Sequence, residues 1–230
     1  MNDLLAHGTM EVLGRLVDAS NATLFGEVFL NGQTQKVIYK PIAGERPLWD
    51  FRNGNLANRE IAAYLVSDYA KFDLVPRTLL RDGPFGLGSV QEWIEVDENV
   101  DVIGVGQSDQ PAIRSMALFD AVINNTDRKF GHILVDSKSR IFGCDHGITF
   151  HVENKLRTVL WQFAGLALSP KELDQLETLY SGLKNEALDL RELLSVQEIE
   201  ALIARVENLL KDGLFPLPSE EWPAVPWPPV

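Results

Sequence analysis

The chain has 230 residues, of which 45% are hydrophobic and 23% are charged, so it can bury a core and is not disordered. Its 33 acidic residues outnumber its 21 Lys and Arg residues, which gives a formal net charge of −12. This balance argues against a general nucleic-acid binder, which shows a basic face, and against avid binding to anionic bilayers.

Cysteine usage and hydropathy indicate the compartment. Cys144 is the single cysteine, which excludes an internal disulfide framework and a cysteine-rich zinc site. The first residues carry no secretion signal, and no stretch approaches the roughly 18 apolar residues that a membrane span needs. We therefore expect a cytoplasmic protein without integral membrane association.

The first half of the chain predicts an antiparallel sheet with one helix. Short apolar runs alternate with turn-forming residues, and Asn31-Gly32 is a strong signal for a two-residue hairpin. Ile61, Leu65 and the alanines between them have helical spacing. The expected strands are Met10–Val17, Thr23–Leu30, Val37–Lys40, Val75–Leu80 and Gly88–Glu95, and the expected helix is Leu56–Ala70.

The second half is predicted to be mainly helical, with one short hairpin. Ser169–Glu172 and Ser195–Glu198 are capping boxes that mark two helix starts. Residues 96–110 are acidic without a clear period and predict a linker, while the proline-rich tail predicts an extended segment with Trp222 and Trp227 docked as anchors. The expected helices are Ala112–Asn124, a helix from Ser169 to about Tyr180 and a helix from Ser195 to Gly213, and the expected strands are Ile133–Asp136 and Ile141–Cys144.

Four polar residues occupy positions that suit a chemical role. Lys40 ends an apolar strand, and Glu60 lies in the helix that follows. Asp127 sits in a polar loop after an apolar helix, and Asp145 directly follows a strand of the short hairpin. Carboxylates suit Mg²⁺, and a hairpin fixes their separation, so this is a good place to hold a metal–phosphate group.

In their order and in the elements that carry them, these residues resemble the protein-kinase-like superfamily. The resemblance is greatest to its phosphatidylinositol 3/4-kinase-like branch, in particular a small bacterial family. It covers roughly residues 10–210. The matching strings are VIYKP with Lys40, NREIAAYL with Glu60, NNTDRKFGH with Asp127 and CDHGITF with Asp145.

The resemblance implies a bilobal α+β fold of the protein-kinase-like type. An antiparallel sheet and one helix would form a nucleotide-binding lobe over residues 1–95. A mainly helical catalytic lobe with a short hairpin would cover 96–214, followed by an extended tail rich in Pro and Trp at 215–230. The hinge between the lobes is expected near residues 92–97.

Phosphoryl transfer depends on positioning phosphates and neutralising their charge, and the resemblance implies a role in it for each residue. Lys40, held by Glu60, would bind the α- and β-phosphates of ATP, and Asp145 would hold a divalent metal, Mg²⁺ or Mn²⁺. Asp127 would accept or orient the acceptor hydroxyl, and Lys129 would face the γ-phosphate.

The resemblance also implies contacts with the rest of the nucleotide. Ser20 and Asn21, in the first hairpin turn, would cover the phosphates through short side chains and backbone N–H groups. The backbone of Glu92, Trp93 and Ile94 would hydrogen-bond adenine.

His132 departs from the family pattern, which has an Asn five residues after the catalytic Asp. Imidazole is a poor ligand for Mg²⁺ and a better one for Mn²⁺ or other transition metals. His132 is therefore either a second metal ligand, a substrate contact or a structural histidine.

The expected function is an ATP-dependent phosphotransferase acting on a hydroxyl of a protein, a small molecule or an inositol lipid. Two alternatives stay open: a nucleotidyltransferase that transfers AMP, and a pseudokinase that binds nucleotide and a protein partner. Lys155 and Arg157 could meet an acidic acceptor, although a solvated charge cluster is the preferred interpretation. Cys144 is expected to be a small buried hydrophobe.

Overall fold

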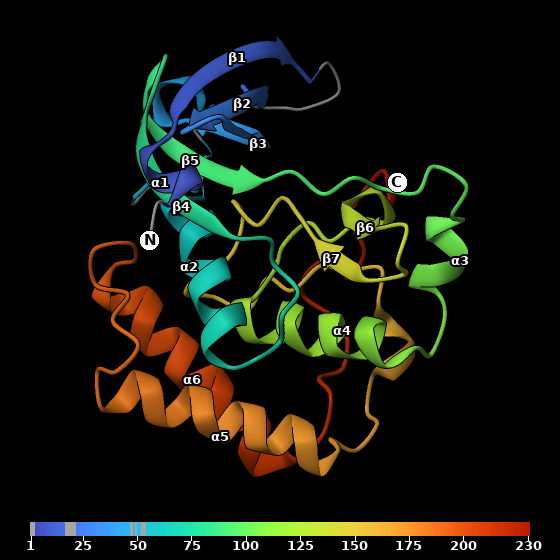
Figure 1. Cartoon of the computed structure of the whole chain (residues 1–230). Coiled ribbons are helices and arrows are strands. Elements are labelled where there is room, and N and C mark those ends of the chain that lie inside the picture. The colour runs from blue at the N-terminus through green and yellow to red at the C-terminus, as the bar shows by residue number, and fades with distance from the viewer. Residues whose placement is uncertain (1–2, 17–21, 47, 49, 52–53) are drawn as a thin grey trace.

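The computed structural model describes residues 3–16, 22–46, 48, 50–51 and 54–230. A sheet lobe lies above a mainly helical lobe, and one extended stretch of chain connects them (Figure 1). The expected α+β, two-lobed architecture is confirmed.

The sheet has five antiparallel strands in the order β1-β2-β3-β5-β4. Asn31 and Gly32 form the predicted two-residue turn, with φ angles of 51° and 77°, so Leu30 pairs with Gln33. The strands are β1 (Thr9–Arg15), β2 (Leu24–Leu30), β3 (Gln33–Pro41), β4 (Thr78–Gly83) and β5 (Gly86–Glu92).

Two strand ends differ from the predicted ones for a physical reason. The strand expected from Val75 begins at Thr78, because the backbone N–H groups of Leu74 and Val75 donate to the Ser67 hydroxyl instead of a neighbouring strand. The strand expected to reach Glu95 ends at Glu92, after which the chain leaves the sheet.

Side chains alternate across the sheet and give it two different faces. One face is a small core closed by the helix α1 (Leu4–His7), with Leu24, Val28, Val37, Tyr39 and Val90 packed against Leu5. The opposite face looks toward the second lobe and carries Lys40.

The helix α2 (Leu56–Tyr69) joins the two lobes. Asn55 caps its first turn, and the Glu45 carboxylate accepts hydrogen bonds from the backbone N–H groups of Leu56 and Ala57. Although α2 lies between strands in the sequence, Ala62, Ala63 and Val66 belong to the large core of the helical lobe.

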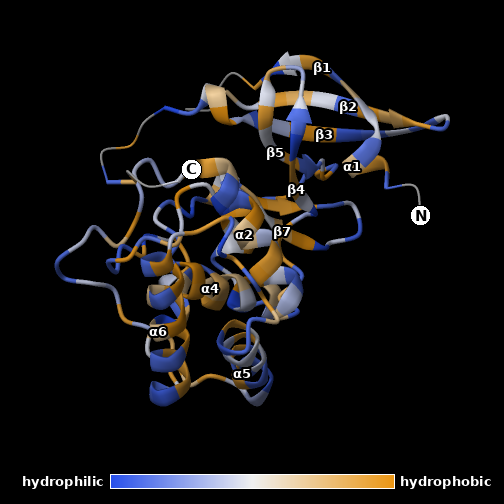
Figure 2. Ribbon diagram, turned by 90° about the vertical axis from the view of Figure 1, so that its left-hand side faces the viewer, coloured by the Kyte–Doolittle hydropathy of each residue, from blue (hydrophilic) through white to orange (hydrophobic). Residues whose placement is uncertain are grey.

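Both predicted capping boxes form at the starts of the long C-terminal helices. Figure 2 shows hydrophobic residues of α6 on the side facing α4 and hydrophilic residues outside. The elements of this lobe are α3 (Val102–Gly106), α4 (Pro111–Ile123), β6 (Ile133–Val135), β7 (Ile141–Gly143), α5 (Pro170–Lys184) and α6 (Val196–Asp212), with short 3₁₀ turns at Phe130–His132 and Trp161–Phe163 and one in the sheet lobe at Ile42–Gly44.

Two sequence-based expectations were wrong in detail. The stretch 96–110 is not only a linker, because it contains α3, whose first turn is capped by the Asp101 carboxylate. In the tail, Trp222 is half-buried, but Trp227 is 86% exposed and docks nowhere. The backbone also holds the tail, since the Ala224 carbonyl accepts from the Thr158 N–H and the Trp161 indole N–H.

None of the helices in the described part of the chain has the length and apolar character that crossing a bilayer requires.

Candidate phosphotransfer site

A cleft between the lobes brings together side chains that are far apart in the sequence. Lys40 comes from β3, Glu60 from α2, Asp127 from the loop after α4 and Asp145 from the segment after β7, and all four line this cleft. Its free volume is about 50 Å³. Lys40 contacts both Glu60 and Asp145 directly, whereas Asp127 lines the same cleft and pairs with Lys129.

Lys40 is the centre of an ion-pair chain. Its ammonium group donates to Glu60 Oε1 and, at 2.9 Å, to Asp145 Oδ1. Burial would lower the pKa of Lys40, but the carboxylates of Asp145 and Glu60 outweigh it and raise this pKa above its usual range. In turn, the Lys40 charge holds the pKa of Asp145 well below its usual range, so both groups are charged.

Glu60 is fixed at both of its carboxylate oxygens. Its second oxygen accepts a hydrogen bond of 3.0 Å from the His146 backbone N–H, one residue after Asp145. Asp145 itself has φ of 59°, in the left-handed region, which Asp adopts more readily than most residues. Its side chain is 54% exposed toward the cleft, whereas that of Glu60 is 3% exposed.

Asp127 is placed by the end of α4. Asn124 ends the helix with φ of 52°, and the Asn125 side chain accepts from the Asp127 N–H at 3.0 Å. Burial raises the pKa of Asp127 despite the opposing charge of Lys129, whose ammonium lies 3.4 Å from the Asp127 carboxylate. A raised pKa makes this carboxylate a better proton acceptor near neutral pH.

His132 points at the same carboxylate as Lys40. Its Nε2 lies 3.6 Å from Asp145 Oδ2, while its buried Nδ1 has no hydrogen-bond partner among the described residues. Burial lowers the pKa of His132, which keeps the imidazole neutral and its nitrogen lone pair available. Asp145 and His132 therefore form a carboxylate–imidazole pair that could hold a divalent cation.

The described residues contain no ready-made cluster of three or more His, Cys, Asp or Glu ligands. Asp145 and His132 alone would suit a cation whose other ligands are phosphate oxygens and water molecules.

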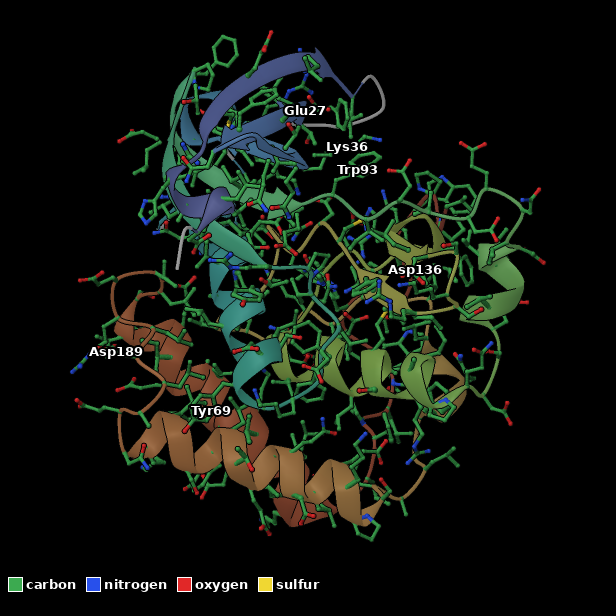
Figure 3. All side chains as sticks on the ribbon, in the orientation of Figure 1. Glu27, Lys36, Tyr69, Trp93, Asp136 and Asp189 are labelled. Atoms are coloured by element: carbon green, nitrogen blue, oxygen red, sulfur yellow. The ribbon has the colours of Figure 1, made fainter. Side chains whose placement is uncertain are left out.

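The connection between the lobes is built by Glu92, Trp93 and Ile94. The N–H groups of Glu92 and Trp93 already donate to the carbonyls of Arg77 and Lys36, the latter over 3.1 Å. Figure 3 shows Lys36 and Trp93 side by side where the sheet meets this connection.

The structure places these three residues around a separate hollow of about 390 Å³ behind the connection. The lining of that hollow includes neither Lys40 nor Asp145, so we place the candidate site in the smaller cleft between the lobes.

Two aromatic or aliphatic side chains on the cleft face were missed by the sequence analysis. Phe25 pairs with Ile38 across β2 and β3, and Ile38 shares its face with Lys40 because residues two apart in a strand point the same way. The Phe25 ring also packs edge-on against Trp93, with 5.0 Å between ring centroids. The sequence could have predicted this position. Side chains of a strand alternate between its two faces, and Lys40 marks the face of β3 that the small core does not cover.

The buried Arg128 was also missed. Its guanidinium is fully buried, pairs with Asp120 at 2.9 Å and donates to the carbonyls of His132 and Cys144 and to His146 Nε2. Arg128 thus joins the Asp127 loop to the Asp145 segment. The available signal was Asp120, a carboxylate among the apolar residues of α4.

Other expectations have mixed outcomes. Ser20 and Asn21 lie outside the described residues. Lys155 was expected in a solvated charge cluster, which is wrong, because it is buried and pairs with Asp50 at 3.1 Å. Cys144 is partly buried, and burial raises the pKa of its thiol to about 12.

Comparison with known proteins finds a relative in sequence and similar solved structures. Protein Rv2133c of Mycobacterium tuberculosis (strain ATCC 25618 / H37Rv) is 39% identical over 263 residues, covering 98% of this chain and 94% of that protein. No family model matches the chain.

The crystal structure of the Golgi casein kinase has a TM-score of 0.57 and 12% identity, over 90% of this chain and 72% of that one. That of the Helicobacter pylori proinflammatory kinase CtkA has a TM-score of 0.50 and 13% identity, over 92% of this chain and 94% of that one. At such identities the likeness shows a kinase-like fold.

Proposed function

We propose that this chain, which belongs to the family of the Mycobacterium tuberculosis protein Rv2133c, is an ATP-dependent phosphotransferase, because its fold is kinase-like. The observation that carries this proposal is the chain of contacts from Glu60 through Lys40 to Asp145, with Asp127 in the same cleft. A charged lysine between two carboxylates is suited to exchange one of them for phosphate oxygens.

Each residue then has one task. Lys40, held by Glu60, binds the inner phosphates and so must give up its direct hydrogen bond to Asp145. Asp127 accepts the proton of the acceptor hydroxyl, and Lys129 balances charge on the transferred group. Phe25 and Ile38 offer the apolar surface on which the adenine ring would lie.

Asp145 is the residue that would hold the divalent cation, with His132 beside it. When bound, the cation would neutralise phosphate charge. The negative charge of Asp145, maintained by Lys40, keeps this position ready without a proton having to leave.

The acceptor is a hydroxyl of a protein, a small molecule or an inositol lipid. The similarity to phosphatidylinositol 3/4-kinase-like proteins motivates the lipid, while the net charge of −12 argues against an avid membrane binder.

A second candidate function is a pseudokinase, and His132 is the observation that favours it. An imidazole in place of an amide ligand would weaken a second Mg²⁺ site and turnover with it, while Lys40 and Asp145 could still bind nucleotide.

The test combines nucleotide binding with transfer. ATP with Mg²⁺ or Mn²⁺ should raise the melting temperature of the wild type, and Lys40→Met should abolish that rise. Asp127→Asn should keep the rise and lose about 10²–10⁴-fold in turnover, because only the proton acceptor is removed. Arg191→Met, in an exposed ion pair far from the cleft, is the control.

Equal stabilisation of wild type and Lys40→Met by ATP would contradict the proposed site. Stabilisation without measurable turnover under either metal would favour the pseudokinase. Intact mass of the product separates a phosphorylated acceptor from one that carries AMP.

A further inference from the structure

Asp127 lies in a loop whose backbone is held almost entirely by one other segment, residues 148–159. The Thr126 N–H donates to the Ile148 carbonyl at 3.1 Å, and the Asn125 carbonyl accepts from the Arg157 N–H at 2.9 Å. On the other side, the Arg128 N–H donates back to the Arg157 carbonyl. The residues before and after Asp127 therefore take their positions from this segment.

Lys155 fixes the middle of that segment. Its backbone N–H donates to the Asn124 side chain at 3.0 Å, and the same amide of Asn124 donates to the carbonyls of His151 and Glu153. The Lys155 side chain is 6% exposed and reaches the Asp50 carboxylate at 3.1 Å. Asp50 belongs to the stretch between β3 and α2, so the ion pair crosses from one lobe to the other.

Three further contacts lie beside this ion pair. The Lys155 ammonium lies 5.0 Å from the centre of the Trp222 ring, in the C-terminal tail. His151 Nε2 lies 3.0 Å from the Asp50 carbonyl, and its ring packs edge-on against Phe51. Three distant parts of the chain thus meet at one buried lysine.

From these contacts we infer that Lys155 is a positioning residue for Asp127. It ties the segment that supports the Asp127 loop to the sheet lobe through Asp50 and to the tail through Trp222. This inference rests on the proposed function only for its catalytic consequence, because the mechanical connection does not depend on which reaction the site performs.

The connection predicts a specific kinetic effect. In Lys155→Met the segment loses its ion pair with Asp50 and keeps the contacts of His151 with Asp50 and Phe51. The Asp127 loop is then held less rigidly, while Lys40, Glu60 and Asp145 keep their own contacts. Turnover should therefore fall by about tenfold to a hundredfold, since small misplacements of a reacting group are costly, while KM for ATP stays unchanged.

The experiment measures ATP hydrolysis, with water as the acceptor, in wild type, Lys155→Met, Lys155→Arg and Asp50→Asn. Lys155→Arg should restore most of the rate, because Arg can also pair with Asp50 and lie over Trp222. A double variant that combines Lys155→Met with Asp50→Asn should lose no more turnover than the more severe of the two single variants, because both residues act through one ion pair. Lys71→Met, which removes an exposed lysine of another ion pair, is the matched control.

Unchanged turnover in Lys155→Met, or a loss confined to KM for ATP, would overturn the inference. If the wild type does not hydrolyse ATP, amide hydrogen exchange of residues 124–130 decides on the positioning role, and the proposed function fails as well if ATP does not stabilise the protein. Faster exchange there in Lys155→Met than in Lys71→Met would support the positioning role, and equal exchange would overturn it.

Discussion

Asp127 and Asp145 are two carboxylates of one cleft whose surroundings shift their pKa values in opposite directions. Lys40 holds the pKa of Asp145 below its usual range, whereas burial raises the pKa of Asp127. Residues with such divergent environments commonly divide the work of a site, one as a permanent charge and one as a proton acceptor. This division agrees with the roles proposed for them.

The buried histidines give the protein a pH-dependent stability. Burial lowers the pKa of His146 and His132 in the folded state, so below about pH 6.5 the unfolded chain binds protons that the folded chain does not. The free energy of unfolding should therefore decrease as the pH drops from 7 to 5. Each of the two histidines contributes at most about 1.4 kcal/mol per pH unit to this decrease.

Urea unfolding at several pH values measures this slope. His146→Gln should reduce it, because the amide oxygen still accepts from Arg128 and does not titrate in this range, while His7→Gln, at an exposed site, serves as control. An equal slope in wild type and His146→Gln would contradict the assignment.

The role of His132 can be tested through the metal preference of the protein. If its Nε2 shares a cation with Asp145, turnover or ATP affinity should be greater with Mn²⁺ than with Mg²⁺, and His132→Asn should shift the preference toward Mg²⁺. A metal titration of both proteins measures this. A structural His132 would instead change the stability in the Asn variant and leave the metal preference as it was.

At the scale of elements, two capping-box glutamates offer a matched comparison. Glu198 pairs with Arg59, whose side chain is 3% exposed, and Glu172 pairs with Arg114, which is 23% exposed. Glu198→Gln should lower the free energy of unfolding by about 3–5 kcal/mol, because the charge of the buried Arg59 then no longer faces the Glu198 carboxylate. Glu172→Gln should lower the free energy of unfolding by about 1 kcal/mol, since solvent can still reach the Arg114 side chain.

Chemical denaturation of the two variants measures the difference. Equal losses would mean that the bridge from α2 to α6 contributes no more than an ordinary helix cap.

Local signals predicted the elements well where a few neighbouring residues determine the structure. The Asn31-Gly32 turn and both capping boxes form as expected. The helix α3 was missed because Val102–Gly106 is short, contains two glycines and has no apolar period. Lys155 and Trp227 were misjudged because their burial depends on distant segments, which no local pattern specifies.

For the candidate site, too, some features could be predicted from the sequence and others could not. The resemblance to the protein-kinase-like superfamily predicted that Lys40, Glu60, Asp127 and Asp145 share a cleft, and all four line one cleft in the structure. The cross-links that hold them, such as Asp120 with Arg128, join residues that sequence spacing alone does not pair.

At the scale of the whole molecule, the described residues form two hydrophobic cores of unequal size. The sheet lobe relies on a small cluster around Val28 and Tyr39, while the helical lobe has an extensive one that includes α4 and α6. We therefore expect amide exchange to be faster in β1 and β2 than in α4 and α6, because fewer apolar contacts oppose local opening.

Exchange measured by mass spectrometry with and without ATP and Mn²⁺ tests this arrangement. Nucleotide should slow exchange in β2 and β3, which border the cleft, more than in α5 and α6. A uniform rate over both lobes would contradict the existence of two separately opening units.

The helix α2, which carries Glu60, is packed into the core of the helical lobe. Protein kinases commonly turn themselves off by moving the corresponding helix and breaking the lysine–glutamate pair. Here such a movement would pull Ala62, Ala63 and Val66 out of the large core and separate Arg59 from Glu198. We therefore expect α2 to keep the Lys40–Glu60 pair formed whether or not nucleotide is bound, so that a change in activity would come from the loops that line the cleft.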